Sequence, residues 1–187
     1  EGAGSAIRIV AMNRARESDF AAAPPVSLST LRAGEMLVIE VWASHAGEEG
    51  IAAAYLDLHF DARALEVKRI RPSAAFGLLP GGRLIAGQGR IESLGGCAPL
   101  GEGGFGAAGA WVCAARVTAR ALDGAQAMSP SGISDATAGI YVRSEPAAMP
   151  FGIALFGAFE FQSEQEVEFG AVRFGVESPE PMPMWRR

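Results

Sequence analysis

Residues 54 to 60 carry the pattern that most narrows the fold of this chain, a strict alternation of side chains. One side of the segment is apolar and the other is not, with Ala54, Leu56, Leu58 and Phe60 on the first and Tyr55, Asp57 and His59 on the second. A two-residue period is that of a β-strand with one buried face. A turn at Asp61 follows, and Leu65 and Val67 begin another strand. This unit predicts an all-β protein.

The same period recurs in several other segments, which we therefore expect to be strands. They are residues 7–12, 36–43, 83–86, 88–94, 111–119, 153–161 and 167–176, the last with a phase change at Gly170 that indicates a bulge. Turn-rich stretches such as 46–50 and 79–82 separate them. No long segment has the helical period. Many short strands with turns between them predict a two-sheet sandwich.

The chain length fits one domain with a substantial core, because it has 187 residues of which 49% are apolar. We expect residues 1–176 to form this single β-sandwich domain. Residues 177–187 differ, since Pro179, Pro181 and Pro183 stand at alternate positions. This spacing keeps a segment out of a central strand and favours an extended, polyproline-like C-terminal tail.

The charge and the apolar runs exclude two classes of partner. A formal net charge of −5 argues against nucleic acid, because phosphate binding needs a concentrated basic surface. The longest apolar run, residues 147–159, is interrupted by proline and glycine and is too short to span a membrane. Lys68 is the only lysine, so lysines cannot guard the sheet edges against edge-to-edge pairing. The chain begins at Glu1 without methionine, and we expect a processed form.

Cys97 and Cys113 are the only cysteines, and they flank a glycine-rich loop. Such a loop is costly to order, and a disulfide across it would be worth roughly 3 kcal/mol of loop entropy. Two buried free thiols are the alternative. We expect the disulfide, and with it an extracellular or cell-surface location.

Three segments together resemble a known family. Gly50-Ile51 leads into residues 54–61 and then into Ala64-Leu-Glu-Val67, which is similar to the cohesin-like sandwich, that is, type I and II cohesins and related bacterial carbohydrate-binding modules. Residues 33–41 resemble the earlier strand of that family, and residues 111–119 its later core strand. The resemblance covers about half of the chain.

The resemblance implies a fold and a class of function. It implies an extracellular jelly-roll sandwich of about nine strands without catalytic activity. Family members bind dockerins, bind glycans or serve as structural modules. The loop between Cys97 and Cys113, the proline-rich tail and the extra length are not features of the family, and they count against a dockerin receptor.

Several motifs suggest chemistry, but each has a simpler interpretation. Residues 104–109 match G-x-G-x-x-G without the preceding strand and following helix of a dinucleotide site, so no cofactor is expected. His59 beside Asp57 suggests a metal or acid–base pair, but no ligand cluster supports one. Asp61 fits a turn cap better than a calcium ligand. The pair Glu164 and Glu166 reads as a polar turn rather than a glycosidase dyad. The sequence therefore predicts no enzyme and no metal site.

The remaining hypotheses concern binding. The leading one is a secreted structural module that assembles with itself or with another extracellular protein. In it, the strand residues Ile7, Ile9 and Val10 are exchanged between subunits, and the tail docks through Met184, Trp185 and Arg186. The alternative is a recognition module that binds a dockerin-type partner or a polysaccharide. Trp42 and Tyr55 are then the candidate glycan contacts, because each lies opposite its strand's apolar side.

Overall fold

The computed structural model describes residues 4–101, 103–122, 140–147, 152–158 and 161–177. Its regular structure consists almost entirely of strands, in the order β1 Ser5–Met12, β2 Phe20–Ala21, β3 Thr30–Arg32, β4 Met36–His45, β5 Ile51–Phe60, β6 Leu65–Pro72, β7 Leu78–Ile85, η1 Ala86–Gln88, β8 Arg90–Cys97, β9 Trp111–Ala121, β10 Ile140–Pro146, β11 Ile153–Leu155, η2 Glu164–Glu166, β12 Val167–Glu168 and β13 Ala171–Glu177. The two η elements are single 3₁₀ turns. The predicted all-β class is confirmed.

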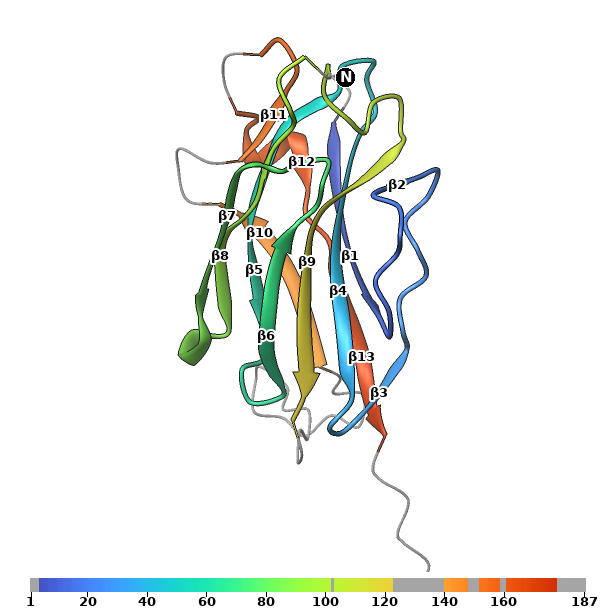
Figure 1. The fold of residues 1–187 in the computed structure, drawn as a ribbon, viewed down its shortest axis with the longest axis vertical. Coiled ribbons are helices and arrows are strands. Elements are labelled where there is room, and N and C mark those ends of the chain that lie inside the picture. The colour runs from blue at the N-terminus through green and yellow to red at the C-terminus, as the bar shows by residue number, and fades with distance from the viewer. Residues whose placement is uncertain (1–3, 102, 123–139, 148–151, 159–160, 178–187) are drawn as a thin grey trace, which may run out of the picture.

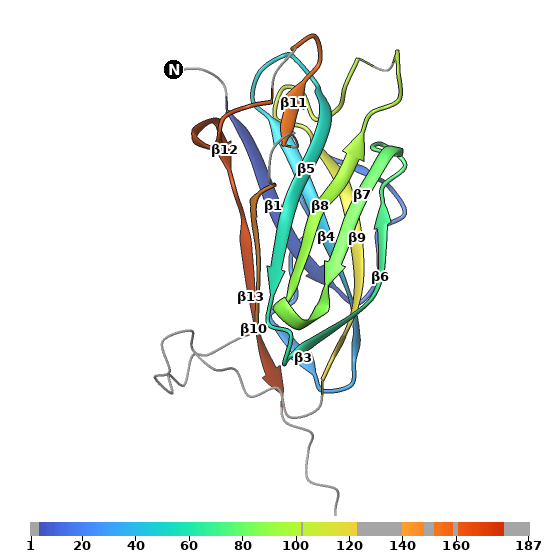
Figure 2. The ribbon, with the colours of Figure 1, turned by 90° about the vertical axis from the view of Figure 1, so that its left-hand side faces the viewer.

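The strands form two sheets packed face to face. The first sheet has the order β12-β1-β4-β9-β2, with β6 also beside β9, and the second has the order β3-β13-β10-β5-β8-β7, with β11 beside β5. Figure 1 looks onto the first sheet, and Figure 2 shows β5, β8 and β7 of the second sheet in front. Nine of the described strands are long, with seven or more residues each, and the other four have two or three. The resemblance to cohesins implied about nine strands. The architecture is therefore the predicted two-sheet sandwich.

The core between the sheets is built from the alternating residues of both. Leu56, Leu58 and Phe60 of β5 all lie in it, as the sequence predicts. From the first sheet, Ile39 and Val117 pack against them in the same continuous cluster. The inner face of each sheet is apolar because its alternate residues meet the other sheet and not water.

The predicted bulge at Gly170 is wrong, because the chain changes sheets there. Before it, β12 pairs in parallel with β1, and after it, β13 pairs antiparallel with β10. A Cβ atom at Gly170 would lie 2.5 Å from the carbonyl oxygen of Ile7. The close passage of the two backbones explains why a residue without a side chain occupies the crossing.

A bulge does occur in β9, where it changes which residues face the core. The register of β4 against β9 shifts between Val41 and Trp42. Val112 and Ala114 face the core on one side of the shift, and Ala115 faces it on the other. The strand was predicted to keep one phase from residue 111 to 119, and that detail is wrong.

The predicted disulfide between Cys97 and Cys113 is not present, since both cysteines are free. Cys113 packs with Val10 and Trp42 on the outer side of the first sheet. Cys97 packs near Tyr55 on the outer side of the second sheet. The core of the sandwich separates the two thiols, so a pairing argument based on loop length alone fails.

Candidate functional site

The outer face of the first sheet is covered by the chain itself. Residues 13–29 leave β1, pass over this face and return to β1. Over the face, Arg16 N–H donates to the carboxylate of Glu40 at 2.9 Å, and on the return Leu28 N–H donates to the carbonyl of Ala11 at 2.8 Å. Under this segment Trp42 is completely buried. A face closed in this way cannot offer Trp42 to a partner.

A charged network fastens the covering segment to the sheet. Glu40 is completely buried, and its carboxylate accepts hydrogen bonds from Trp42 Nε1 at 3.1 Å and from Arg116 Nε at 2.9 Å. Arg116 also forms an ion pair with Asp19, which belongs to the covering segment. Such buried carboxylates are tolerated only because they are paired and hydrogen-bonded. The network is therefore structural.

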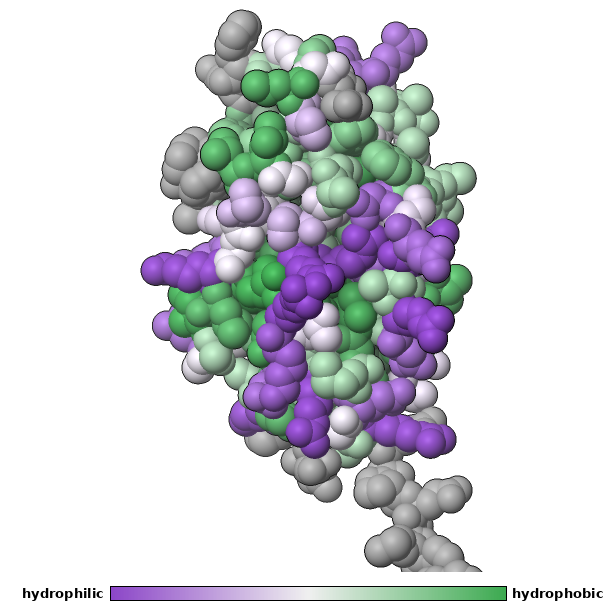
Figure 3. All heavy atoms as spheres, viewed as in Figure 1, coloured by the Kyte–Doolittle hydropathy of each residue, from purple (hydrophilic) through white to green (hydrophobic). Residues whose placement is uncertain are grey.

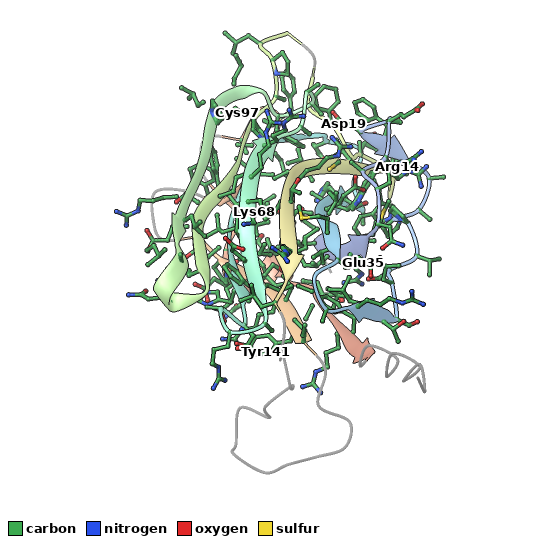
Figure 4. All side chains as sticks on the ribbon, turned by 60° about the horizontal axis from the view of Figure 1, so that its bottom comes forward. Arg14, Asp19, Glu35, Lys68, Cys97 and Tyr141 are labelled. Carbon is green, nitrogen blue, oxygen red and sulfur yellow. The ribbon has the colours of Figure 1, made fainter. Side chains whose placement is uncertain are left out.

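The uncovered edge of the first sheet is basic. Arg69 and Arg71 on β6 and Arg120 on β9 are exposed, and Lys68 lies where the β6–β9 register shifts (Figure 4). Hydrophilic side chains follow β6 and β9 across this view of the surface (Figure 3). The only lysine of the chain thus stands in a strand that ends the sheet, where charge opposes edge-to-edge pairing.

The outer face of the second sheet carries a row of ion pairs, on the half of β10, β5, β8 and β7 that is drawn lower in Figure 2. Glu145 on β10 contacts Arg143 at 2.7 Å and His59 at 3.1 Å. The row continues across β5, β8 and β7 through the pairs Asp57–Arg90 and Glu92–Arg83. Among the described residues no segment crosses this charged half. Its charges are therefore available to a partner.

Asp57 is the buried residue of this row. It is almost fully buried, and its carboxylate accepts a hydrogen bond from Ser93 N–H at 2.9 Å as well as the Arg90 pair. The hydrogen bond that Arg90 donates to the Asp57 carboxylate, together with the attraction between the two charges, raises the pKa of Arg90. Asp57 is thus committed to Arg90 and Ser93, and His59 pairs with Glu145 instead. The structure does not bring Asp57 and His59 together as an acid–base pair.

The other half of the same face is apolar and small-featured. A second cluster outside the core contains Ala53, Tyr55 and Ala147, with Cys97, Ala154 and Phe161 packed around it. Tyr55 O–H donates to the carbonyl of Leu79 at 2.7 Å, and burial raises the pKa of Tyr55 above its usual range. Leu79 itself has a φ of 47° and is 77% exposed. An exposed leucine in the left-handed region is uncommon.

The predicted glycan contacts do not form an aromatic platform. Trp42 is covered by residues 13–29, and Tyr55 is only 3% exposed because the Leu79 backbone and its apolar neighbours enclose it. These residues pointed away from the core as expected, but a further layer covers each. Neither ring is exposed for stacking on a sugar in this structure, and the glycan contact of Trp42 and Tyr55 stays a prediction.

The residues predicted for assembly have two outcomes. Ile7, Ile9 and Val10 lie in β1, where they are buried and paired with β4 of the same chain. Met184, Trp185 and Arg186 lie outside the described residues. Both assembly contacts stay predictions.

One arrangement of side chains resembles a catalytic triad, and sequence reasoning missed it. Ser5 Oγ lies 3.0 Å from His45 Nδ1, and His45 Nε2 lies 3.9 Å from Glu49 Oε2. Ser5 and His45 are buried, and Ser5 Oγ donates to Gln162 Oε1 at 2.5 Å. A serine that donates its proton to an amide and has no access to solvent is a packing contact that joins β1, β4 and residues 161–163.

The other motifs have structural roles. Asp61 Oδ1 accepts a hydrogen bond from Arg63 N–H at 2.9 Å, which confirms the turn cap. Glu166 closes a capping box with Ser163 at the start of η2. The glycines at 104, 106 and 109 have positive φ and seat the loop against the start of β5, where Phe105 pairs with Ile51. Within the described ranges no group of three His, Cys, Asp or Glu residues could hold a metal ion.

No helix of the described structure is long and apolar enough to cross a membrane.

The arrangement of the two sheet faces makes the outer face of β10, β5, β8 and β7 the candidate site. Asp57, His59 and Tyr55 were visible as its residues from the alternation in β5. Arg90, Glu92 and Glu145 were missed, because short alternating segments do not reveal which strands become neighbours.

Comparison with solved structures gives a consistent result. The seventh type I cohesin of ScaB from Pseudobacteroides cellulosolvens matches with a TM-score of 0.55 and 14% identity, over 98% of this chain and 99% of that one. A type I cohesin–dockerin complex from Clostridium thermocellum matches with a TM-score of 0.54 and 15% identity, over 96% and 98%. A cohesin module from a family 33 glycoside hydrolase of Clostridium perfringens matches with a TM-score of 0.51 and 9% identity, over 95% and 98%.

No family model matches the sequence, and no curated protein matches it. The likeness is therefore one of fold. The chain has a cohesin-like β-sandwich, as the resemblance in β4, β5 and β9 predicts. The described part of the chain corresponds to nearly the whole length of the compared modules.

Proposed function

We propose that this chain is a non-enzymatic recognition module that binds another protein through the outer face of β10, β5, β8 and β7. The observation that carries the proposal is the contrast between the two outer faces. The first sheet is covered by residues 13–29, whereas the charged half of the second is crossed by no described segment. Residues 13–29 close the β1–β4 part of the first face and leave its basic β6–β9 edge exposed, so the second face offers the broader surface for a partner.

The composition of the open face suits a protein partner. In its apolar half Ala53, Tyr55 and Ala147 are buried, and the partly exposed Cys97, Ala154 and Phe161 around them remain for contact with a partner. Its charged half, from Arg143 to Arg83, places both signs of charge in fixed positions. Apolar contact supplies affinity and arranged charge supplies specificity.

A dockerin-type partner is the first to test. One of the compared structures is a complex of a cohesin with a dockerin, and its fold spans almost the whole of this chain. The location outside the cell or at its surface is part of the same proposal. The disulfide no longer supports that location, because Cys97 and Cys113 are free.

Self-assembly by strand exchange is the second candidate. Exchange would keep the pairings of Ile7, Ile9 and Val10 with β4 but would take the two strands from different chains. The observation that favours it is the connector of residues 13–29, which separates β1 from the next long strand and is long enough to act as a hinge. A polysaccharide is a weaker partner, since Trp42 and Tyr55 are buried.

The test is calorimetric titration of the protein with a panel of dockerin modules, using two charge reversals. Arg143→Glu alters the open face, and Arg120→Glu alters an exposed arginine of the first sheet. We expect at least one dockerin to bind, and to bind Arg143→Glu at least tenfold more weakly, because a repelling charge is introduced into the contact. Arg120→Glu should bind as the parent does.

Two results would count against the proposal. Loss of binding in Arg120→Glu with normal binding in Arg143→Glu would move the site to the first sheet. Failure of every dockerin to bind would remove the dockerin-type partner and leave self-assembly as the better account.

A further inference from the structure

A groove lies at the apolar end of the second sheet, between β5, β10 and the segment of residues 161–169. Its volume is about 270 Å³, and its walls are mainly apolar. The side chains that matter for recognition are those of Tyr55, Ala147, Ile153, Phe161, Val167 and Phe169. One acidic residue, Glu164, lies in the lining and is exposed. The groove therefore suits an apolar ligand that carries positive charge at one end.

The C-terminal segment of the chain has this chemistry. Residues 178–187 contain Met182, Met184 and Trp185, followed by Arg186 and Arg187. Three prolines at alternate positions preset an extended backbone, so less conformational entropy is lost when the segment binds. Proline-rich segments are commonly recognised by grooves with aromatic walls.

The segment starts at the wrong end of the molecule to reach its own groove. β13 runs from Ala171, beside the groove, to Glu177 at the opposite end of the sandwich (Figures 1 and 2). The eight residue-to-residue steps from Phe169 to Glu177 span about 26 Å when extended. Trp185 lies eight residues beyond Glu177 and would need an immediate reversal and full extension to come back as far as Phe169.

We propose that the groove binds the C-terminal segment of a second copy of this chain. Trp185 and the two methionines fill the apolar part, and Arg186 or Arg187 pairs with Glu164. The groove and Glu177, after which the donor segment begins, lie at opposite ends of each molecule. Such a head-to-tail contact does not close on itself, and it links copies into a chain. This partner is distinct from a dockerin-type protein, although the groove shares Tyr55, Ala147 and Phe161 with the apolar half of the face proposed for that protein.

The test follows the mass of the full chain by static light scattering as its concentration rises. We expect the parent mass to increase with concentration and a peptide of residues 178–187 to reverse the increase. Trp185→Ala should weaken association by roughly tenfold or more, because a buried tryptophan is a frequent hot spot. Phe161→Ala should do the same from the groove side. Phe156→Ala is the matched control, since Phe156 is 52% exposed at the same end of the molecule and does not line the groove.

Mixing the two variants gives the decisive result. Trp185→Ala keeps the groove and Phe161→Ala keeps the tail, so each alone should stay monomeric while the mixture forms dimers and nothing larger. Thermal melting of each variant shows whether its fold is intact, and dockerin binding by Trp185→Ala should equal that of the parent. The proposal is overturned if the parent stays monomeric, if the mixture does not associate, or if Trp185→Ala assembles like the parent, in which case exchange of β1 takes its place.

Discussion

Glu40 and Arg116 show how single charged residues decide which face of this sandwich is open. Both lie on the outer side of the first sheet, where alternation places polar residues in contact with water. Here Glu40 is fully buried and the Arg116 side chain is partly buried, because Asp19 and the N–H of Arg16 close over them. The ion pairs thus fasten a connector over one face, and the other face is the one that we propose as the binding surface.

Arg116→Met should strongly destabilise the fold. It leaves the carboxylates of Glu40 and Asp19 in a buried site without their cation, at a cost of about 3 kcal/mol. Arg120→Met is the control on the same strand, and its exposed side chain should change stability by no more than about 0.5 kcal/mol. Urea unfolding of both variants measures the difference. Equal unfolding midpoints would show that the network does not hold the covering segment.

The sequence was informative about single residues only where they face the core. Leu56, Leu58 and Phe60 were placed correctly because alternation is a local property. The burial of Trp42 and Tyr55 was not predictable in the same way. Each is covered by a segment without a periodic pattern, residues 13–29 in one case and the Leu79 turn in the other. Coverage of an outward face is a tertiary property.

At the scale of elements, periodicity predicted the long strands correctly, but it did not predict where the chain passes from one sheet to the other. β4, β5 and β9 appear where alternation predicts them, whereas β10 was missed and β11 is shorter than predicted. Gly170 marked a real break, but a local phase change cannot distinguish a bulge from a strand that crosses to the other sheet. The charged half of the candidate site depends on β8 and β10 as neighbours of β5, so it could not be assembled from the sequence.

The placement of β8 and β9 on different sheets predicts the chemistry of the two thiols. Cys97 is partly exposed, whereas Cys113 is fully buried, and burial raises the pKa of the Cys113 thiol above its usual range. The reactive form is the thiolate, so iodoacetamide at pH 8 should label Cys97 alone in the native protein. In denaturant without reductant both cysteines should be labelled, as read by mass spectrometry. Absence of label on both in denaturant would show that they are paired as a disulfide.

At the scale of the whole molecule, the sandwich has two outer faces with different tasks. The first carries its own cover and a basic edge along β6 and β9, where hydrophilic residues gather in Figure 3. The second offers a charged half and an apolar half with a groove at its end. This asymmetry is the structural basis of the recognition function that we propose.

The open face can be tested directly by photo-crosslinking without knowledge of the partner. A photoreactive residue is placed at position 143 in one variant and at position 120 in another, and each protein is irradiated in an extract of the cells that produce it. The account predicts a protein adduct from position 143 and none from position 120, with the partner identified by mass spectrometry. An adduct from position 120 alone would contradict the assignment of the binding face to β10, β5, β8 and β7.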